Sequence, residues 1–133
     1  MRFKNESKRL KKEFSELYQQ NMELFDLLVE LDAYCLANFS KELTLTMIYR
    51  TQEEQDHLYR NSEKYQEKPF KSPHQFWQAA DIRSWTFTKQ EQKKIERMLN
   101  RKYNKANYYR WTAKVHNVGA GVHFHIQFIP KES

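Results

Sequence analysis

Two histidines near the C-terminus lie two residues apart in a segment of alternating polar and apolar side chains. Within residues 122–128, His123, His125 and Gln127 alternate with valine, phenylalanine and isoleucine. Successive side chains of a β-strand point to opposite faces, so the pattern predicts a strand with one face in the core and two imidazoles on the other. Neutral imidazole is the commonest metal ligand, but a His-x-His strand alone also fits ordinary strand histidines.

A histidine and an aspartate seven residues apart form a second candidate pair. His74 ends a polar segment, and Asp81 follows Ala79 and Ala80 in a short apolar segment. A buried carboxylate is costly unless it is paired or bound to a cation. Two histidines and one aspartate would hold zinc with three ligands and leave a position for water, which is the catalytic arrangement.

The order of these motifs resembles the zinc D-Ala-D-Ala carboxypeptidase family. That family includes VanY-type carboxypeptidases and phage L-alanyl-D-glutamate endopeptidases, within the lysostaphin, carboxypeptidase and hedgehog superfamily. The resemblance covers residues 43–129 and is carried by Ser72-Pro73-His74, Ala79-Ala80-Asp81, the His-x-His strand and the upstream segment Thr46-Met47-Ile48-Tyr49-Arg50-Thr51-Gln52-Glu53-Glu54-Gln55 with Leu58-Tyr59.

This resemblance implies an enzyme, a peptidase that holds one Zn²⁺ ion through His74, Asp81 and His125. Its implied substrate is a peptide bond of the peptidoglycan stem peptide. Arg50 would lie beside the zinc, where its permanent charge and forked donors could bind the scissile carbonyl oxygen or a substrate carboxylate. The alternative for Arg50 is a surface salt bridge with a glutamate of the segment that follows it.

The chain departs from the family pattern at two positions. Trp77 stands where the family often has glycine, and Val122 stands where its peptidases commonly carry Glu or Asp, three residues before the last ligand. In family members with a His-x-His strand, the first histidine acts on the reacting water and the second binds the metal. By its position, His123 is the residue expected to have the first role. If residues 117–121 form a hairpin loop, His116 lies near His123 on the neighbouring strand and is a second catalytic candidate.

Other side chains near the motifs are candidates for substrate contact. Ser72 could hydrogen-bond near the first ligand, or it could simply cap its loop. Trp77 and Trp111 could line a substrate groove, although most aromatic residues beside the motifs are expected in the core or the pocket wall. His57, on the predicted helix after Arg50, is expected to be exposed and without function.

The pattern of helices and strands around these residues predicts an α+β fold, with a small, mostly antiparallel sheet that carries the zinc site and packs against helices. Apolar residues three or four apart predict a long N-terminal helix, or two short ones in line. Thr51 and Thr88 are predicted helix caps. The expected elements are helices over 6–39, 51–60 and 88–102, strands over 43–49, 78–82, 108–115 and 122–129, and a loop over 61–73.

The composition fits one domain over residues 1–133, with a helical segment over 1–40 and a motif-bearing core over 43–129. A single cysteine excludes an internal disulfide. No apolar run reaches membrane-spanning length, and the charged N-terminus lacks the pattern of a signal peptide. We therefore expect a monomer that is cytoplasmic at synthesis and acts on the wall if released, as a phage lysis enzyme would be.

The net charge of +6 and the pI of about 9.4 suit an anionic partner, either a wall polymer or nucleic acid. Two alternatives to the peptidase therefore stay open. One is a zinc-binding module of the same fold with an impaired active site that binds wall fragments. The other is a basic nucleic-acid-binding protein, which is disfavoured because no nucleic-acid motif appears in the sequence.

Overall fold

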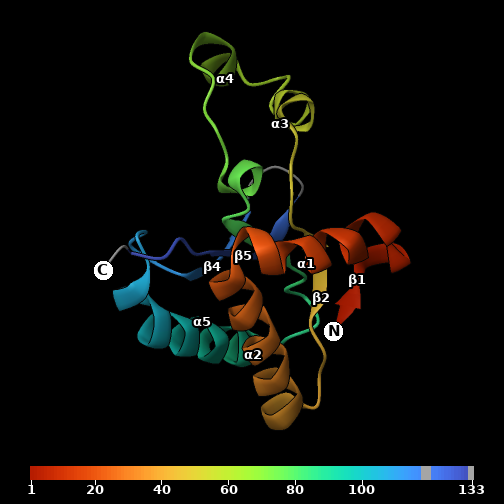
Figure 1. The fold of residues 1–133 in the computed structure, drawn as a ribbon, viewed down its shortest axis with the longest axis vertical. Coiled ribbons are helices and arrows are strands. Elements are labelled where there is room, and N and C mark those ends of the chain that lie inside the picture. The colour runs from red at the N-terminus through yellow and green to blue at the C-terminus, as the bar shows by residue number, and fades with distance from the viewer. Residues whose placement is uncertain (118–120, 132–133) are drawn as a thin grey trace.

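The computed structural model describes residues 1–117 and 121–131 (Figure 1). The middle of the expected 117–121 loop, residues 118–120, lies outside this description. The described elements are β1 (Arg2–Phe3), η1 (Lys4–Glu6), α1 (Lys8–Gln20), α2 (Met22–Phe39), β2 (Thr44–Met47), α3 (Gln52–Leu58), α4 (Glu63–Glu67), η2 (Pro73–Phe76), β3 (Ala79–Ile82), α5 (Lys89–Tyr103), η3 (Asn104–Ala106), β4 (Ala113–Asn117) and β5 (Val122–Gln127).

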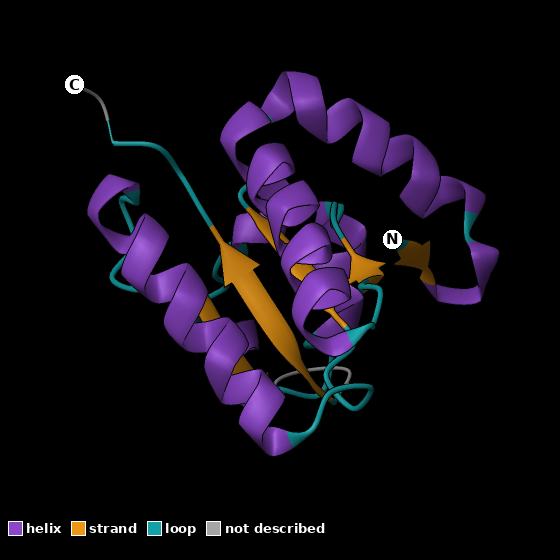
Figure 2. Ribbon diagram, turned by 90° about the horizontal axis from the view of Figure 1, so that it is seen from below, coloured by secondary structure: helices purple, strands orange, loops and turns teal. Residues whose placement is uncertain are grey.

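The strands form one mixed sheet in the order β1-β2-β3-β5-β4, in which only the β1–β2 pair is parallel. This confirms the predicted α+β class and the mostly antiparallel sheet. Helices α2 and α5 lie on one side of the sheet, whereas α3 and α4 project from the other (Figures 1 and 2). The site residues on β3 and β5 therefore lie on two adjacent, hydrogen-bonded strands in the interior of the sheet.

The core lies between the sheet and these helices. Phe124, Ile126 and Phe128 on β5 and just after it are buried, as their alternation predicts, and they join leucines of α2 and α5. Val122, at the start of the same alternation, is instead 58% exposed. No helix in the described part of the chain is long and apolar enough to cross a membrane.

The N-terminal helical segment is two helices rather than one continuous helix. Asn21 ends α1 and caps α2, because its side-chain oxygen accepts from the backbone N–H of Leu24. Its amide group donates to the carbonyl oxygens of Trp77 and Phe128 at 3.1 and 2.8 Å. The two helices are therefore not in line, and the corner between them is attached to the sheet (Figure 1).

Thr51 and Thr88 cap α3 and α5 with complete capping boxes, which confirms both predicted helix starts. The predicted loop over 61–73 contains a short helix, α4, which Ser62 caps and Tyr65 anchors by burial against neighbouring aromatic rings. The predicted strand over 108–115 begins only at Ala113. The side-chain oxygen of Asn100 accepts hydrogen bonds from the backbone N–H groups of residues 112 and 113. These donors are therefore not available for strand pairing, which a longer strand would require.

Candidate metal centre

Three buried side chains from different parts of the chain converge at the middle of the sheet. His74 lies on η2, Asp81 on β3 and His125 directly opposite it on β5. His74 Nε2 and His125 Nδ1 each lie 3.1 Å from Asp81 Oδ1, and the two rings are nearly perpendicular. The potential ligand atoms lie within 4.8 Å of one another. The structure thus brings together the three predicted ligands in a candidate metal site.

The outer nitrogens of both imidazoles have partners that orient the rings. His74 Nδ1 donates to the Ile48 carbonyl oxygen at 3.0 Å, and His125 Nε2 donates to Gln127 Oε1 at 3.0 Å. A neutral imidazole with one nitrogen protonated presents a lone pair at the other. The nitrogens that face Asp81 are then acceptors, like the carboxylate itself. This donor-free group matches the usual arrangement of histidine metal ligands with outer hydrogen-bond partners.

Asp81 is ionised despite its burial. Removal from water has the largest single effect and raises its pKa, but the positive charge of His74, and the hydrogen bonds that His125 and His74 donate to Asp81 when their rings are protonated, outweigh it. The resulting pKa lies well below the ordinary range of an aspartate. Asp81 is therefore in the deprotonated form that metal coordination requires.

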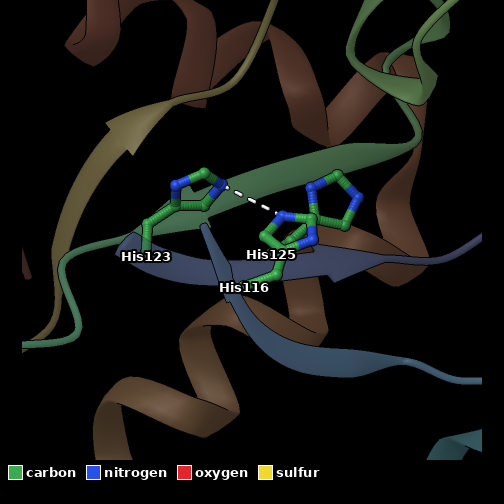
Figure 3. Close-up of side chains that lie close together, drawn as sticks. All are labelled: His116, His123 and His125. Carbon is green, nitrogen blue, oxygen red and sulfur yellow. Dashed lines mark hydrogen bonds between the residues drawn. The ribbon is translucent and has the colours of Figure 1, made fainter. Parts of the chain in front are cut away.

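His123 and His116 lie close to His125 (Figure 3) and are less buried than the three residues of this group. They are opposite each other on β5 and β4, which confirms the predicted pairing, and their Nε2 atoms are 3.2 Å apart. His123 Nδ1 donates to the Gly121 carbonyl oxygen at 2.8 Å, and its Nε2 lies 3.4 Å from Asp81 Oδ2. Burial, with repulsion from His125 and His123, lowers the pKa of His116 to about 4, so its imidazole is neutral near pH 7.

Arg50 is buried beside the three ligands and lines the same cavity. Its guanidinium donates to Gln55 Oε1 at 2.8 Å and contacts Met47 Sδ at 3.3 Å, and its backbone N–H donates to the His74 carbonyl oxygen. None of the ion pairs among the described residues includes Arg50, so the surface salt bridge considered above does not form. A buried cation held by neutral acceptors alone retains capacity to bind an anion.

Ser72 and Trp77 have different positions relative to the cavity. Ser72 lines it, and its hydroxyl accepts from the backbone N–H of His74 at 3.2 Å, which holds the first ligand in its turn. Trp77 is absent from the cavity lining: its ring stacks on Tyr49 and packs against the core. Its backbone has φ of 59°, a left-handed conformation that glycine adopts more readily than tryptophan. Trp111 lines the cavity instead, with its ring edge-on to His125.

The cavity has a volume of about 210 Å³. Several of its residues were not predicted from the sequence, among them Tyr59, Phe70 and Lys71 from the segment that contains α3 and α4. Gln127 was also assigned no role, although its place two residues after His125 puts it on the same strand face. Among the described residues that line this cavity, Asp81 is the sole carboxylate, so no carboxylate other than a predicted metal ligand is available there to accept a proton.

Comparison with known proteins gave no matching family model, no matching curated protein and no matching solved structure.

Proposed function

We propose that this protein is a zinc metallopeptidase that hydrolyses a peptide bond in bacterial peptidoglycan stem peptides, of D-Ala-D-Ala carboxypeptidase or L-Ala-D-Glu endopeptidase type. The observation that carries the proposal is the convergence of His74, Asp81 and His125 with their acceptor atoms facing one another. Three protein ligands beside an open cavity suit catalytic zinc. The peptidoglycan substrate, and a role in phage lysis, rest on the motif resemblance.

Zinc bound at this site would polarise the scissile carbonyl and supply a water with a pKa near 7. His123 is the proposed proton acceptor, because its Nδ1 donates to the Gly121 carbonyl and leaves the lone pair of Nε2 on the side of Asp81. His116, within hydrogen-bonding distance of His123, can exchange a proton with it. Two histidines thereby replace the carboxylate that the family pattern places at the position of Val122.

Substrate binding is supported by the cations near the site. A second cavity has a volume of about 360 Å³ and shares Arg50, Asp81 and His123 with the first, so the two adjoin at the candidate metal centre. Its lining adds Lys4 and Arg83. Stem peptides carry free carboxylates, and a forked guanidinium binds a carboxylate through two parallel hydrogen bonds. Arg50 is the proposed anchor because it is buried and faces both cavities.

Digestion of purified peptidoglycan tests the proposal. The protein is incubated with the polymer with and without a chelator, and the products are identified by mass spectrometry. We expect release of fragments from one bond type, loss of release with chelator and recovery with added Zn²⁺. Asp81→Asn should abolish release, whereas His57→Ala should not, since His57 is exposed on α3. No product, or the same product with chelator present, would contradict a zinc peptidase.

A non-catalytic zinc module that binds wall fragments is the second candidate. It is favoured by one observation, that Asp81 is the only carboxylate among the described cavity residues. In that case the protein would retain zinc and bind soluble stem peptides without cleaving them. Calorimetric binding of such peptides, combined with unchanged peptide masses after long incubation, distinguishes this candidate from the peptidase.

A further inference from the structure

His116, His123 and His125 form a second group of potential metal ligands next to the first (Figure 3). Each offers one ring nitrogen, and the three nitrogens lie within 4.8 Å of one another. His116 and His123 are half-buried, whereas His125 is only 7% exposed, so the group extends from the buried centre toward solvent. The group contains no carboxylate, which distinguishes it chemically from the first.

The spacing of the two outer histidines matches that of ligands on one ion. Metal–nitrogen bonds of about 2.0–2.1 Å, at angles from the square-planar 90° to the tetrahedral 109°, put two ligand nitrogens about 2.8–3.4 Å apart. The His116 and His123 Nε2 atoms are 3.2 Å apart, and the rings are close to perpendicular. His123 donates its Nδ1 hydrogen to the Gly121 carbonyl, so its Nε2 already has the lone pair that a metal needs. If the His116 proton moves from Nε2 to Nδ1, the Nε2 atom of His116 provides a second lone pair for the metal.

We propose that His116, His123 and His125 form an alternative metal position that takes a nitrogen-preferring cation such as Cu²⁺. Three neutral imidazoles suit copper, nickel or zinc, whereas the carboxylate of the first position adds a harder ligand. His125 belongs to both groups. Its Nε2 donates to Gln127, so only Nδ1 is free to bind a metal, and the two positions exclude each other.

If the protein is the proposed peptidase, a metal at the alternative position should affect its activity. An ion at the alternative position would occupy the lone pairs of His116 and His123, which the proposed reaction uses for proton transfer, and it would withdraw His125 from the first position. Copper in excess of zinc should then inhibit the peptidase. Copper binding at the alternative position is measured without any hydrolysis assay. A failure of this proposal can therefore be distinguished from a failure of the peptidase proposal.

The test uses the full chain with Asp81→Asn, which weakens the first position while it keeps the shape of the side chain. We expect calorimetry to show one Cu²⁺ ion bound per chain, and electron paramagnetic resonance to show coupling to three nitrogens. Adding His116→Ala should weaken copper binding by about 10-fold or more and remove one coupled nitrogen. Adding His57→Ala, the exposed control on α3, should change neither reading.

Copper affinity and nitrogen coupling that are unchanged by His116→Ala would overturn the proposal, as would the absence of copper binding in folded Asp81→Asn protein. Far-ultraviolet circular dichroism checks the fold of each variant. If Asp81→Asn does not fold, His74→Ala removes a different ligand of the first position and leaves the three-histidine group intact. The same dependence on His116 is then expected in that background.

Discussion

The two ring nitrogens of His125 have different roles, since Nδ1 faces Asp81 and Nε2 donates to Gln127. On the proposed assignment, replacement of His125 removes a metal ligand rather than an outer hydrogen-bond partner. We therefore predict that His125→Ala lowers zinc affinity by more than the roughly 10- to 100-fold that loss of an outer partner causes. Metal analysis after dialysis against a competing chelator measures this. His57→Ala should retain wild-type zinc, and equal zinc contents in the two variants would contradict the assignment.

His123 should separate metal binding from turnover. Its Nε2 is 3.4 Å from Asp81 Oδ2, on the more exposed side of the centre, and it is not one of the three inner ligands. We predict that His123→Ala retains zinc but lowers kcat by about 10²- to 10⁴-fold, the usual contribution of a general base. Kinetics on a defined stem peptide, with zinc content measured in parallel, provide the check. Full activity in this variant would show that another group takes the proton.

At the scale of elements, the side chain of Asn21 attaches the α1–α2 corner to the sheet. Asn21→Ala removes a helix cap, worth about 1 kcal/mol, and leaves two carbonyl oxygens without their donor. We predict a loss of about 2–4 kcal/mol in the free energy of unfolding, because unsatisfied buried acceptors add about 1–3 kcal/mol. Urea denaturation measures it. Asn38→Ala is the matched control, since Asn38 is exposed and bonds within its own helix, and an equal loss there would contradict this account.

Contact between α1 and α3 should depend on pH through Glu54. Both carboxylate oxygens of Glu54 accept from Arg9 at 2.8 Å. Hydrogen bonding from Arg9, opposed by burial and aided by the Thr51 backbone, lowers the pKa of Glu54 to about 2. An unfolded glutamate has a pKa of about 4.3. The stabilisation is therefore complete above about pH 5 and is lost as the pH falls toward about 2.

We predict that Glu54→Gln lowers stability at pH 7 by at most about 1 kcal/mol, because the pair is partly exposed, and that the difference from wild type disappears as the pH falls below about 2. Glutamine can still complete the α3 capping box, so the substitution isolates the charge. Glu53→Gln removes the same charge at a neighbouring exposed position and serves as the control. Thermal unfolding across this pH range measures both. A deficit that persists unchanged to low pH would contradict the ion-pair explanation.

For the whole molecule, metal binding should be coupled to stability, because the centre joins η2, β3 and β5. When His74 and His125 are neutral and no cation is bound, the Asp81 carboxylate faces their lone pairs in a buried site. We predict that Zn²⁺ at 100 times its Kd stabilises the fold by about 2.7 kcal/mol, which corresponds to a rise in Tm of about 10 °C. Calorimetric scans with zinc and with chelator test this. Asp81→Asn should lose most of the rise, whereas an equal rise in that variant would place the bound metal elsewhere.

Features that depend on neighbours along the chain could be predicted from the sequence. Capping boxes at Thr51 and Thr88 require side chains three residues apart, and both form. Alternation along β5 separates His123 and His125 from the buried Phe124 and Ile126, and the short connection sets His116 opposite His123. These interactions are local, so residue type and spacing suffice to predict them.

The resemblance named His74, Asp81 and His125 as one group, but the contacts that hold distant residues together depend on the folded chain. The β3–β5 register puts Asp81 opposite His125, and the end of the β2–β3 pairing at Met47 leaves the Ile48 carbonyl available to His74. The same packing directs Trp77 onto Tyr49 and away from the cavity. Such contacts join residues tens of positions apart. They depend on strand register and on how the core packs, which motif spacing does not specify.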